Sequence, residues 1–329
     1  MSVIATRVVR ALMMTLVSMA VASIAVAQDY PSETIKIVVP YPPGGNSDFI
    51  GRITADKLAE QLGVPVVVEN RPGATGSLGV DYVARSKPDG YTMALAATPQ
   101  FSSNIYILGN VPYDPYKDLA PVSHFLNLSP IWLVANSSLP VGSLADLVQY
   151  AKERPGKLSY GSGGGKGTTT HVAMEQLKRE AGIEIEHVPY PGQAPQLQAL
   201  VAGEIDLALI GTPGPTEFVE AGQLKVLASI SSTRGAPDES VPTMTELGYP
   251  DVTFDVQYGY FVPAGTPDRI VEKLATSLSA IAKDPDVVAQ MKARGNILVA
   301  STPSEFAEVV KQENVRWHAI AKQLDLLAK

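Results

Sequence analysis

Residues 40–48 read Pro-Tyr-Pro-Pro-Gly-Gly-Asn-Ser-Asp, and they join a β-branched run, 35–39, to an amphipathic segment, 49–62. This order predicts a strand, a glycine turn and a helix. Adjacent glycines let the backbone approach a ligand closely. The first N–H groups of a helix have no partners within it, and the positive end of the helix dipole favours an anion. We therefore expect backbone amides of this turn to hold a negatively charged group, most simply a carboxylate.

The candidate ligand-binding residues of this turn are Tyr41, Gly44, Gly45, Asn46 and Ser47. The alternative is a tight turn that only connects a strand to a helix. Asp48 is expected to start the helix and to pair with Arg52 one turn later, because a carboxylate would repel an anionic ligand.

A second glycine-rich segment, 161–171, reads Gly-Ser-Gly-Gly-Gly-Lys-Gly-Thr-Thr-Thr-His and also follows a predicted strand and opens a helix. It does not have the spacing of a nucleotide-binding P-loop, because Lys166 is followed by glycine. Its backbone amides and hydroxyls form a second candidate cradle for an anion. The candidate residues are Ser162, Gly163, Gly165, Lys166, Thr168 and Thr169. The alternatives are a flexible surface loop and, for Lys166, a solvated side chain.

Three further residues are candidates for the same site. Tyr190 and Tyr258 carry a hydroxyl on an apolar body and could wall a cleft, although ordinary packing explains many aromatic residues. Asp206 lies in the apolar run 205–210, where a carboxylate needs partners. It is therefore either a ligand contact or the acceptor of a structural hydrogen bond at the sheet edge.

Composition excludes several function classes. The chain contains no cysteine, which rules out cysteine catalysis, thiolate-bound zinc and iron–sulfur clusters. It carries a formal charge of −7 and no basic block, which argues against nucleic-acid binding. Its four histidines show no metal-ligand spacing, and no nucleophile motif of a hydrolase is present. We expect no metal, no cofactor and no catalytic residue.

The N-terminus has the pattern of a secretory signal peptide. Arg7 and Arg10 precede an apolar stretch, 11–24, and Ala25-Val26-Ala27 forms a small-residue cleavage site. The apolar stretch is short for a membrane span. We expect residues 1–27 to be removed after Ala27 and the remainder to be exported and soluble.

The remaining chain alternates short β-branched runs with helical segments, which predicts open α/β sheets flanked by helices. Its length suggests two domains, and no linker separates them. Ligands of open α/β sheets bind beyond the carboxyl ends of the strands. Two glycine loops that share one ligand must converge, so we expect a cleft between two lobes.

The motifs also resemble, in order along the chain, the Bug family of extracytoplasmic solute receptors of tripartite tricarboxylate transporters. The matching segments are 40–48 with Arg52, 66–74, 88–92, 160–163, 167–168 with His171, 187–190, 203–206 and 263–267. Two positions depart from the family pattern: the run of glycines with Lys166, and Pro191, where a lysine is common.

The resemblance implies a two-lobed periplasmic-binding-protein fold, a Venus flytrap, with one lobe from 28–127 and 256–329 and the other from 128–255. It implies a monomeric periplasmic receptor that captures a small carboxylate, partly through water, and delivers it to membrane subunits of a transporter. A receptor that feeds a sensor, and an exported α/β enzyme, are the alternatives.

Overall fold

The computed structural model describes residues 30–128, 130–212, 214–232, 234–235 and 237–328, and the predicted signal peptide lies outside these residues. Residues 33–329 form one compact unit. Its strands form two separate sheets, each with its own helices. Among the described residues, no helix has the length and apolar composition needed to cross a membrane.

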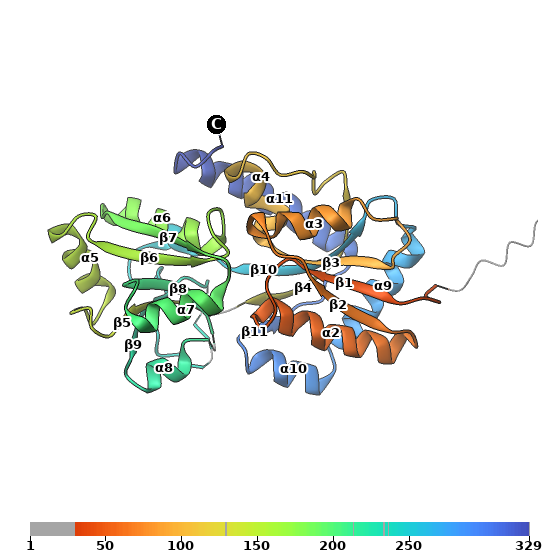
Figure 1. The fold of residues 1–329 in the computed structure, drawn as a ribbon, viewed down its shortest axis with the longest axis horizontal. Helices are drawn as coiled ribbons and strands as arrows, with labels where there is room; N and C mark the ends of the chain where they lie inside the picture. The colour runs from red at the N-terminus through yellow and green to blue at the C-terminus, as the bar shows by residue number, and fades with distance from the viewer. Residues whose placement is uncertain (1–29, 129, 213, 233, 236, 329) are drawn as a thin grey trace, which may run out of the picture. The chain divides into compact units, whose positions relative to one another are not determined.

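The first sheet is built from both ends of the unit. Its strands are β1 (Ile35–Val39), β2 (Val66–Asn70), β3 (Thr92–Ala97), β4 (Leu119–Leu128), β10 (Val256–Pro263) and β11 (Asn296–Leu298). They lie in the order β11-β4-β10-β3-β1-β2. Strand β1 is parallel to β2 and β3, whereas β10 runs antiparallel between β3 and β4. The orange and blue segments in Figure 1 therefore belong to one sheet.

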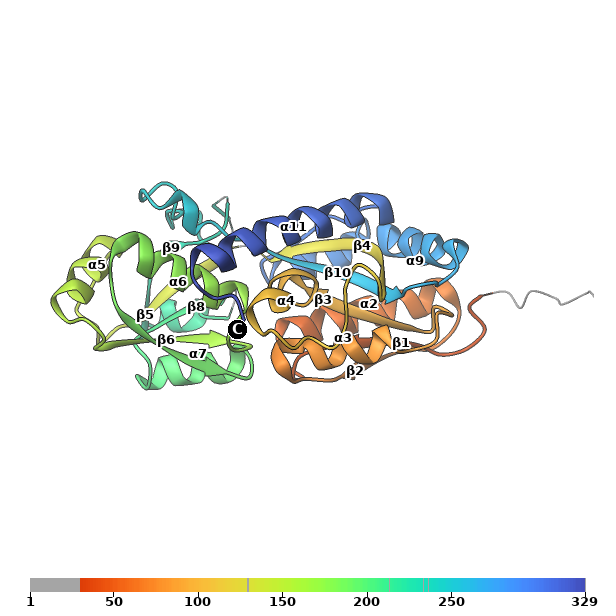
Figure 2. The same cartoon turned by 90° about the horizontal axis from the view of Figure 1, so that it is seen from above.

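Helices from the same two parts of the chain accompany this sheet. They are α2 (Asn46–Leu62), α3 (Ser77–Ala84), α4 (Asn104–Ile107), α9 (Asp268–Ile281), α10 (Pro285–Lys292) and α11 (Pro303–Gln323), with short turns η1 (Ala74–Gly76) and η2 (Pro99–Ser103). Helix α11, seen from above in Figure 2, places the buried ring of Phe306 among Phe101 and Phe261. It begins with a capping box between Thr302 and Glu305.

The second sheet comes from one continuous stretch, green in Figure 1. Its strands are β5 (Ile131–Asn136), β6 (Leu158–Gly163), β7 (Ile185–Tyr190), β8 (Leu207–Gly211) and β9 (Leu224–Ser229), in the order β7-β6-β8-β5-β9. Its helices are α5 (Leu144–Glu153), α6 (Thr169–Ala181), α7 (Gln193–Ala202) and α8 (Thr216–Glu220), and a short turn, η3 (Pro250–Val252), precedes β10. Strand β6 is parallel to β7 and β8.

The candidate ligand-binding positions are the turns that follow the parallel strands. In the first sheet β1 leads into α2, and in the second sheet β6 leads into α6 and β7 into α7. The turn after each strand places the amino end of the next helix at the carboxyl edge of its sheet. The predicted anion loops occupy two of these three turns.

Candidate functional site

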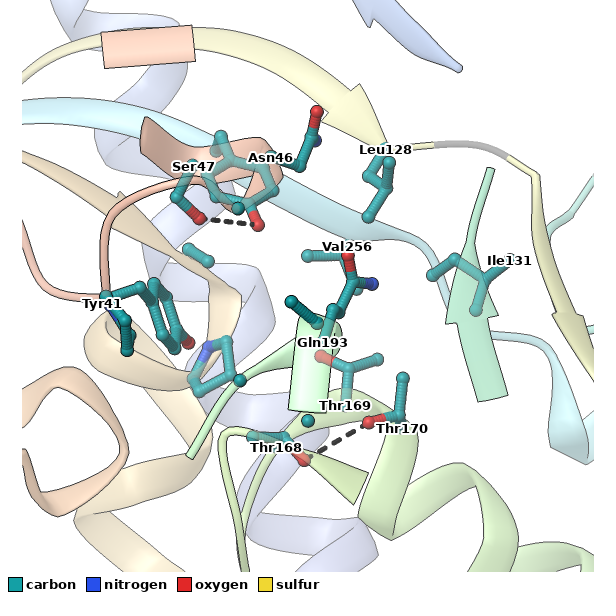
Figure 3. A pocket seen from close by; sticks show the side chains of 18 of the residues that line it. Tyr41, Asn46, Ser47, Leu128, Ile131, Thr168, Thr169, Thr170, Gln193 and Val256 are labelled. Carbon is teal, nitrogen blue, oxygen red and sulfur yellow. Dashed lines mark hydrogen bonds between the residues drawn. The ribbon is translucent and has the colours of Figure 1, made fainter. Parts of the chain in front are cut away.

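The carboxyl ends of these strands border a cavity of about 140 Å³. Figure 3 shows its side chains, which come from both sheets. Eight of the predicted site residues line it: Tyr41, Gly45, Asn46, Ser47, Gly163, Thr168, Thr169 and Tyr258. The two glycine loops therefore converge on one space, as the sequence predicted.

Three helix amino ends meet at this cavity. Its lining includes residues 45–47 at the start of α2, 168–170 at the start of α6 and 192–195 at the start of α7. The N-cap glycines of α2 and α7, Gly45 and Gly192, provide no side-chain hydrogen bond. Each amino end contributes unpaired N–H groups and about half a positive elementary charge. These partial charges favour an anion at the cavity, whose described lining residues include no basic side chain.

Asp48 fixes the first of these turns. Its carboxylate accepts hydrogen bonds from Arg52, from Asn70 Nδ2 at 3.0 Å and from the Gly44 amide at 3.0 Å. Burial alone would raise the pKa of Asp48, but these hydrogen bonds hold it below its usual value. The Asp48–Arg52 pair is as predicted. Gly44 does not line the cavity, and its amide is bound to Asp48, so ligand contact at Gly44 stays a prediction.

Asn46 contributes its backbone N–H to the cavity, because its side-chain amide is already hydrogen-bonded. Its side-chain amide forms a reciprocal pair of hydrogen bonds with Asn296 of β11, at 2.8 and 3.1 Å. As the first residue of α2, it has a backbone N–H without an intrahelical acceptor. The same holds for Ser47, so two adjacent amides are available at this end of the cavity.

Hydroxyl groups complete this wall. The Tyr41 oxygen accepts a hydrogen bond from Gln100 Nε2 at 2.9 Å, so its own proton remains available to a ligand. Burial raises the pKa of Tyr41 and of Tyr258, and both phenols stay protonated at neutral pH. Ser47 Oγ lies 3.1 Å from the Tyr258 hydroxyl, as the dashed line in Figure 3 marks. One proton of that pair joins the two oxygens, which leaves the other free to donate.

Adjacent threonines have opposite roles at the start of α6. Thr168 is the N-cap: its hydroxyl accepts from the His171 amide at 3.3 Å and donates to the Gly165 carbonyl at 2.9 Å. Thr169 is among the residues that line the cavity, and its buried hydroxyl has no hydrogen-bond partner among the described residues. An unpaired buried hydroxyl is costly. Thr169 is therefore the side chain of this loop that most needs a ligand atom.

Ser162 does not line the cavity, and its contact with a ligand stays a prediction. Its hydroxyl is 2.6 Å from His187 Nε2 and 3.1 Å from the Gly165 carbonyl. Burial lowers the pKa of His187 to about 4 and that of His171 to about 3. Both rings are consequently neutral at neutral pH. His171 Nδ1 accepts the Gly167 amide at 3.3 Å, so the two histidines support the loop from behind.

Three other predicted residues of the second sheet's loops also lie outside the cavity lining. Lys166 is exposed, and its carbonyl accepts a hydrogen bond from the Thr75 hydroxyl. Gly165 uses its carbonyl to bind Thr168 and Ser162. Tyr190 is half-buried, and its carbonyl accepts the Gly164 amide at 2.8 Å. The hydrogen bonds of these residues shape the loop, and their contact with a ligand stays a prediction.

Asp206 also lies outside the cavity lining. It comes just before β8, whereas the cavity borders the opposite, carboxyl ends of the strands. Its carboxylate accepts from the Ser159 amide at 2.8 Å and the Ser159 hydroxyl at 3.0 Å. The structural alternative, a hydrogen bond that joins β6 to β8 at the sheet edge, accounts for this residue.

The lining residues that were not predicted include two groups. The first is the start of α7, where Gly192, Gln193, Ala194 and Pro195 line the cavity. The second is an apolar group at the passages between the sheets, formed by Leu128, Ile131 and Val256. For the first group, the only signal in the sequence was its position, because β7 precedes the α7 turn just as β6 precedes the α6 turn.

The described residues that line the cavity include no Lys, Arg, His, Asp or Glu. Among the described residues of the whole chain, no cluster of His, Cys, Asp and Glu suits a metal ion. The lining combines amide donors, hydroxyls and an apolar wall. Such a site suits an organic anion with an uncharged body.

Comparison with known families agrees with this geometry. Residues 50–326 match the family model described as "Tripartite tricarboxylate transporter family receptor". The chain belongs to this family. The resemblance to the Bug receptors is confirmed by a curated relative, Protein BugT of Bordetella pertussis (strain Tohama I). The receptor is 33% identical to it over 298 residues, which cover 90% of this chain and 91% of that protein.

Solved structures support the fold. The receptor has a TM-score of 0.85 to "R. palustris Rpa4515 with adipate", at 33% identity, over 90% of this chain and 99% of that one. It has the same TM-score to "Structure of periplasmic binding protein BugD", at 30% identity, over 91% of this chain and all of that one. The prediction of a two-lobed α/β periplasmic-binding-protein fold is confirmed, and the family is one of substrate-binding receptors.

Proposed function

We propose that this receptor captures a small carboxylate that lacks an ammonium group, and that it does so by binding rather than by catalysis. One observation carries the proposal: three helix amino ends border a cavity without a charged side chain among its described lining residues. The related structure with adipate supports a carboxylate as the ligand. A buried ammonium would have no carboxylate partner in this lining, and burying an unpaired charge is costly.

Each end of the ligand has its own donors. The α2 end would bind a carboxylate through the amides of Asn46 and Ser47, partly through water, and through the hydroxyls of Tyr41 and the Ser47–Tyr258 pair. The opposite end would be bound by Thr169 and by the amide donors of α6 and α7. Leu128, Ile131 and Val256 would contact the apolar body of the ligand. A dicarboxylate fills both ends, whereas a monocarboxylate fills one.

We also propose how the lobes, the ligand and the transporter act together. The lobes would be 28–127 with 256–329 and 128–255, joined where the chain passes between the sheets, and the ligand would favour their closed arrangement. The receptor would act as a monomer in the periplasm after cleavage behind Ala27. The closed form would be recognised by the membrane subunits of a tripartite tricarboxylate-type transporter.

A ligand panel tests the proposed class. We expect adipate to raise the midpoint of thermal unfolding of residues 28–329 and to give a saturable calorimetric signal. The 2-amino derivative of adipate adds one ammonium group and is expected to bind at least about tenfold more weakly. Equal affinity for the two compounds would contradict the exclusion of an ammonium. Binding of neither adipate nor any other carboxylate of the panel would contradict the proposed function itself.

Thr169→Val is expected to weaken carboxylate binding by about tenfold without lowering the stability of the ligand-free protein. Valine keeps the shape but removes a buried hydroxyl that has no protein partner among the described residues. The ligand-free protein loses an unsatisfied group, whereas the complex loses a hydrogen bond to a charged oxygen, typically about 1.5–3 kcal/mol. Calorimetry and thermal unfolding measure the two effects. Thr276→Val, on an exposed position of α9, is the matched control. Unchanged affinity in Thr169→Val would remove this residue from the site.

A further inference from the structure

Thr75 has a strained backbone conformation. It lies in η1, between β2 and α3, with φ of 52° and ψ of 36°, and the preceding Ala74 has φ of 46°. Two consecutive non-glycine residues in the left-handed region are unusual, and a β-branched residue there is a genuine outlier. Such a conformation persists only where surrounding contacts enforce it.

Two buried amides enforce this conformation. The Thr75 carbonyl accepts a hydrogen bond from Gln100 Nε2 at 2.6 Å and another from Asn104 Nδ2 at 3.1 Å. Both donor residues are fully buried. Gln100 is fixed in turn, because its Oε1 accepts the Ala97 amide at 2.7 Å. Turn η2 and helix α4, which follow β3 of the first sheet, therefore hold the Thr75 carbonyl in place.

The strained turn presents its side chain to the other sheet. Thr75 Oγ1 donates to the Lys166 carbonyl at 3.1 Å, in the glycine-rich loop between β6 and α6. Beside it, Ser103 Oγ donates to the Gly167 carbonyl at 2.7 Å. These two hydroxyls tie the first sheet to the loop that carries Thr169.

The side-chain nitrogen of Gln100 connects the Thr75 contact to the cavity. Gln100 Nε2 binds both the Thr75 carbonyl, at 2.6 Å, and the Tyr41 hydroxyl, at 2.9 Å. Tyr41 lines the cavity. A ligand that accepts the Tyr41 proton polarises the phenol oxygen and strengthens its bond to Gln100. The position of Gln100 in turn fixes Thr75.

We propose that Thr75 is a positioning residue that latches the 163–168 loop onto the first sheet, with Gln100 linking the latch to the ligand through Tyr41. Thr75 does not line the cavity and would not contact the ligand. It would stabilise the closed form and slow release of the ligand. The inference rests on the proposed function of the cavity.

Thr75→Val and Thr75→Ser test the hydroxyl, with adipate as the probe. Valine keeps the β-branch and the strain but cannot donate, and we expect about threefold to tenfold faster dissociation of adipate in stopped-flow measurements. Serine keeps the donor and is expected to dissociate at a rate within about twofold of the unchanged receptor. Thr276→Val is again the matched control. Equal dissociation rates in Thr75→Val and the unchanged receptor, or an equal defect in both Thr75 variants, would overturn the latch.

Thr75→Gly separates the latch from a merely structural role. Glycine adopts the left-handed region without steric cost, so the midpoint of thermal unfolding is not expected to fall. The hydroxyl is absent, so adipate is still expected to dissociate faster. A structural role alone would predict that stability and retention of the ligand change in the same direction.

A ligand-free readout keeps this test independent of the proposed function. The chain has no cysteine, so Gln61→Cys on α2 and Lys152→Cys on α5 give two exposed labelling sites, one beside each sheet. Thr75→Val is expected to shift the fluorescence-transfer distance distribution towards longer separations in the ligand-free protein. If adipate fails to bind while this shift is present, the probe or the proposed function fails and the latch stands. An unchanged distribution would overturn the latch.

Discussion

Gly259→Ala is expected to lower the free energy of unfolding by about 3 kcal/mol, because overpacking a rigid core is costly. A Cβ built on Gly259 lies 2.0 Å from Cζ of Phe306 and 2.4 Å from its Cε1. The Phe306 ring is fully buried, with its centroid 4.8 Å from that of Phe261 and 5.8 Å from that of Phe101. Strand β10 pairs on both sides, so the backbone has little freedom to retreat. Chemical denaturation measures the loss.

A double-mutant cycle identifies the cause. Phe306→Ala alone should cost about 3–5 kcal/mol through the cavity that it leaves. In that background the methyl group added by Gly259→Ala has room, so the cost of this substitution should largely disappear. Gly142→Ala, at an exposed position where the new Cβ makes only ordinary contacts, is the control. Additive costs in the double mutant would contradict a collision with Phe306.

Gly45→Val is expected to weaken carboxylate binding at least about a hundredfold, or about 2.7 kcal/mol. Gly45 is extended, with φ of −82° and ψ of 175°, and the atom nearest to a built Cβ is the Pro42 carbonyl oxygen at 3.9 Å. The fold therefore tolerates a side chain here. The two methyl groups would enter the cavity beside the Asn46 and Ser47 amides and displace the carboxylate.

Calorimetry of the folded variant with adipate measures this effect. Gly142→Val is the control, since it makes the same chemical change at an exposed position away from the cavity. Thermal unfolding in the absence of ligand should show similar midpoints for the two variants. A Gly45→Val receptor with normal affinity would mean that the first turn connects a strand to a helix and does not bind the ligand.

The two glycine loops and the helices that follow them could be predicted because their requirements are local. Adjacent glycines after a β-branched run specify a strand, a turn and a helix start without information from the rest of the chain. The sequence could not assign individual donors. Thr168 and Thr169 are neighbours of the same chemistry, yet one hydroxyl is used as the helix cap and the other is left unpaired. The sequence also does not show that the Gly44 amide donates to Asp48.

The main elements that could not be predicted from the sequence are ones that depend on residues far apart in the chain. Strand β4 carries Pro121 and the polar residues Ser123, His124 and Asn127, so its pattern does not indicate a strand. The structure accommodates Pro121 opposite Phe261, where the pairing of β4 with β10 shifts register. The α7 turn was missed for a related reason. Its contribution is made by backbone amides, which any sequence can supply once the chain is placed there.

The position of β10 sets an order for folding. Strands β5 to β9 end at Ser229, so all partners of the second sheet are present once that residue has been delivered. The first sheet must wait for β10, which pairs between β3 and β4, and for β11, which ends at Leu298. Before β10 is available, β3 and β4 lack the strand that pairs between them. Contacts between residues this far apart in the sequence form slowly. A nascent chain therefore remains incompletely folded on its N-terminal side until nearly all of it has been synthesised.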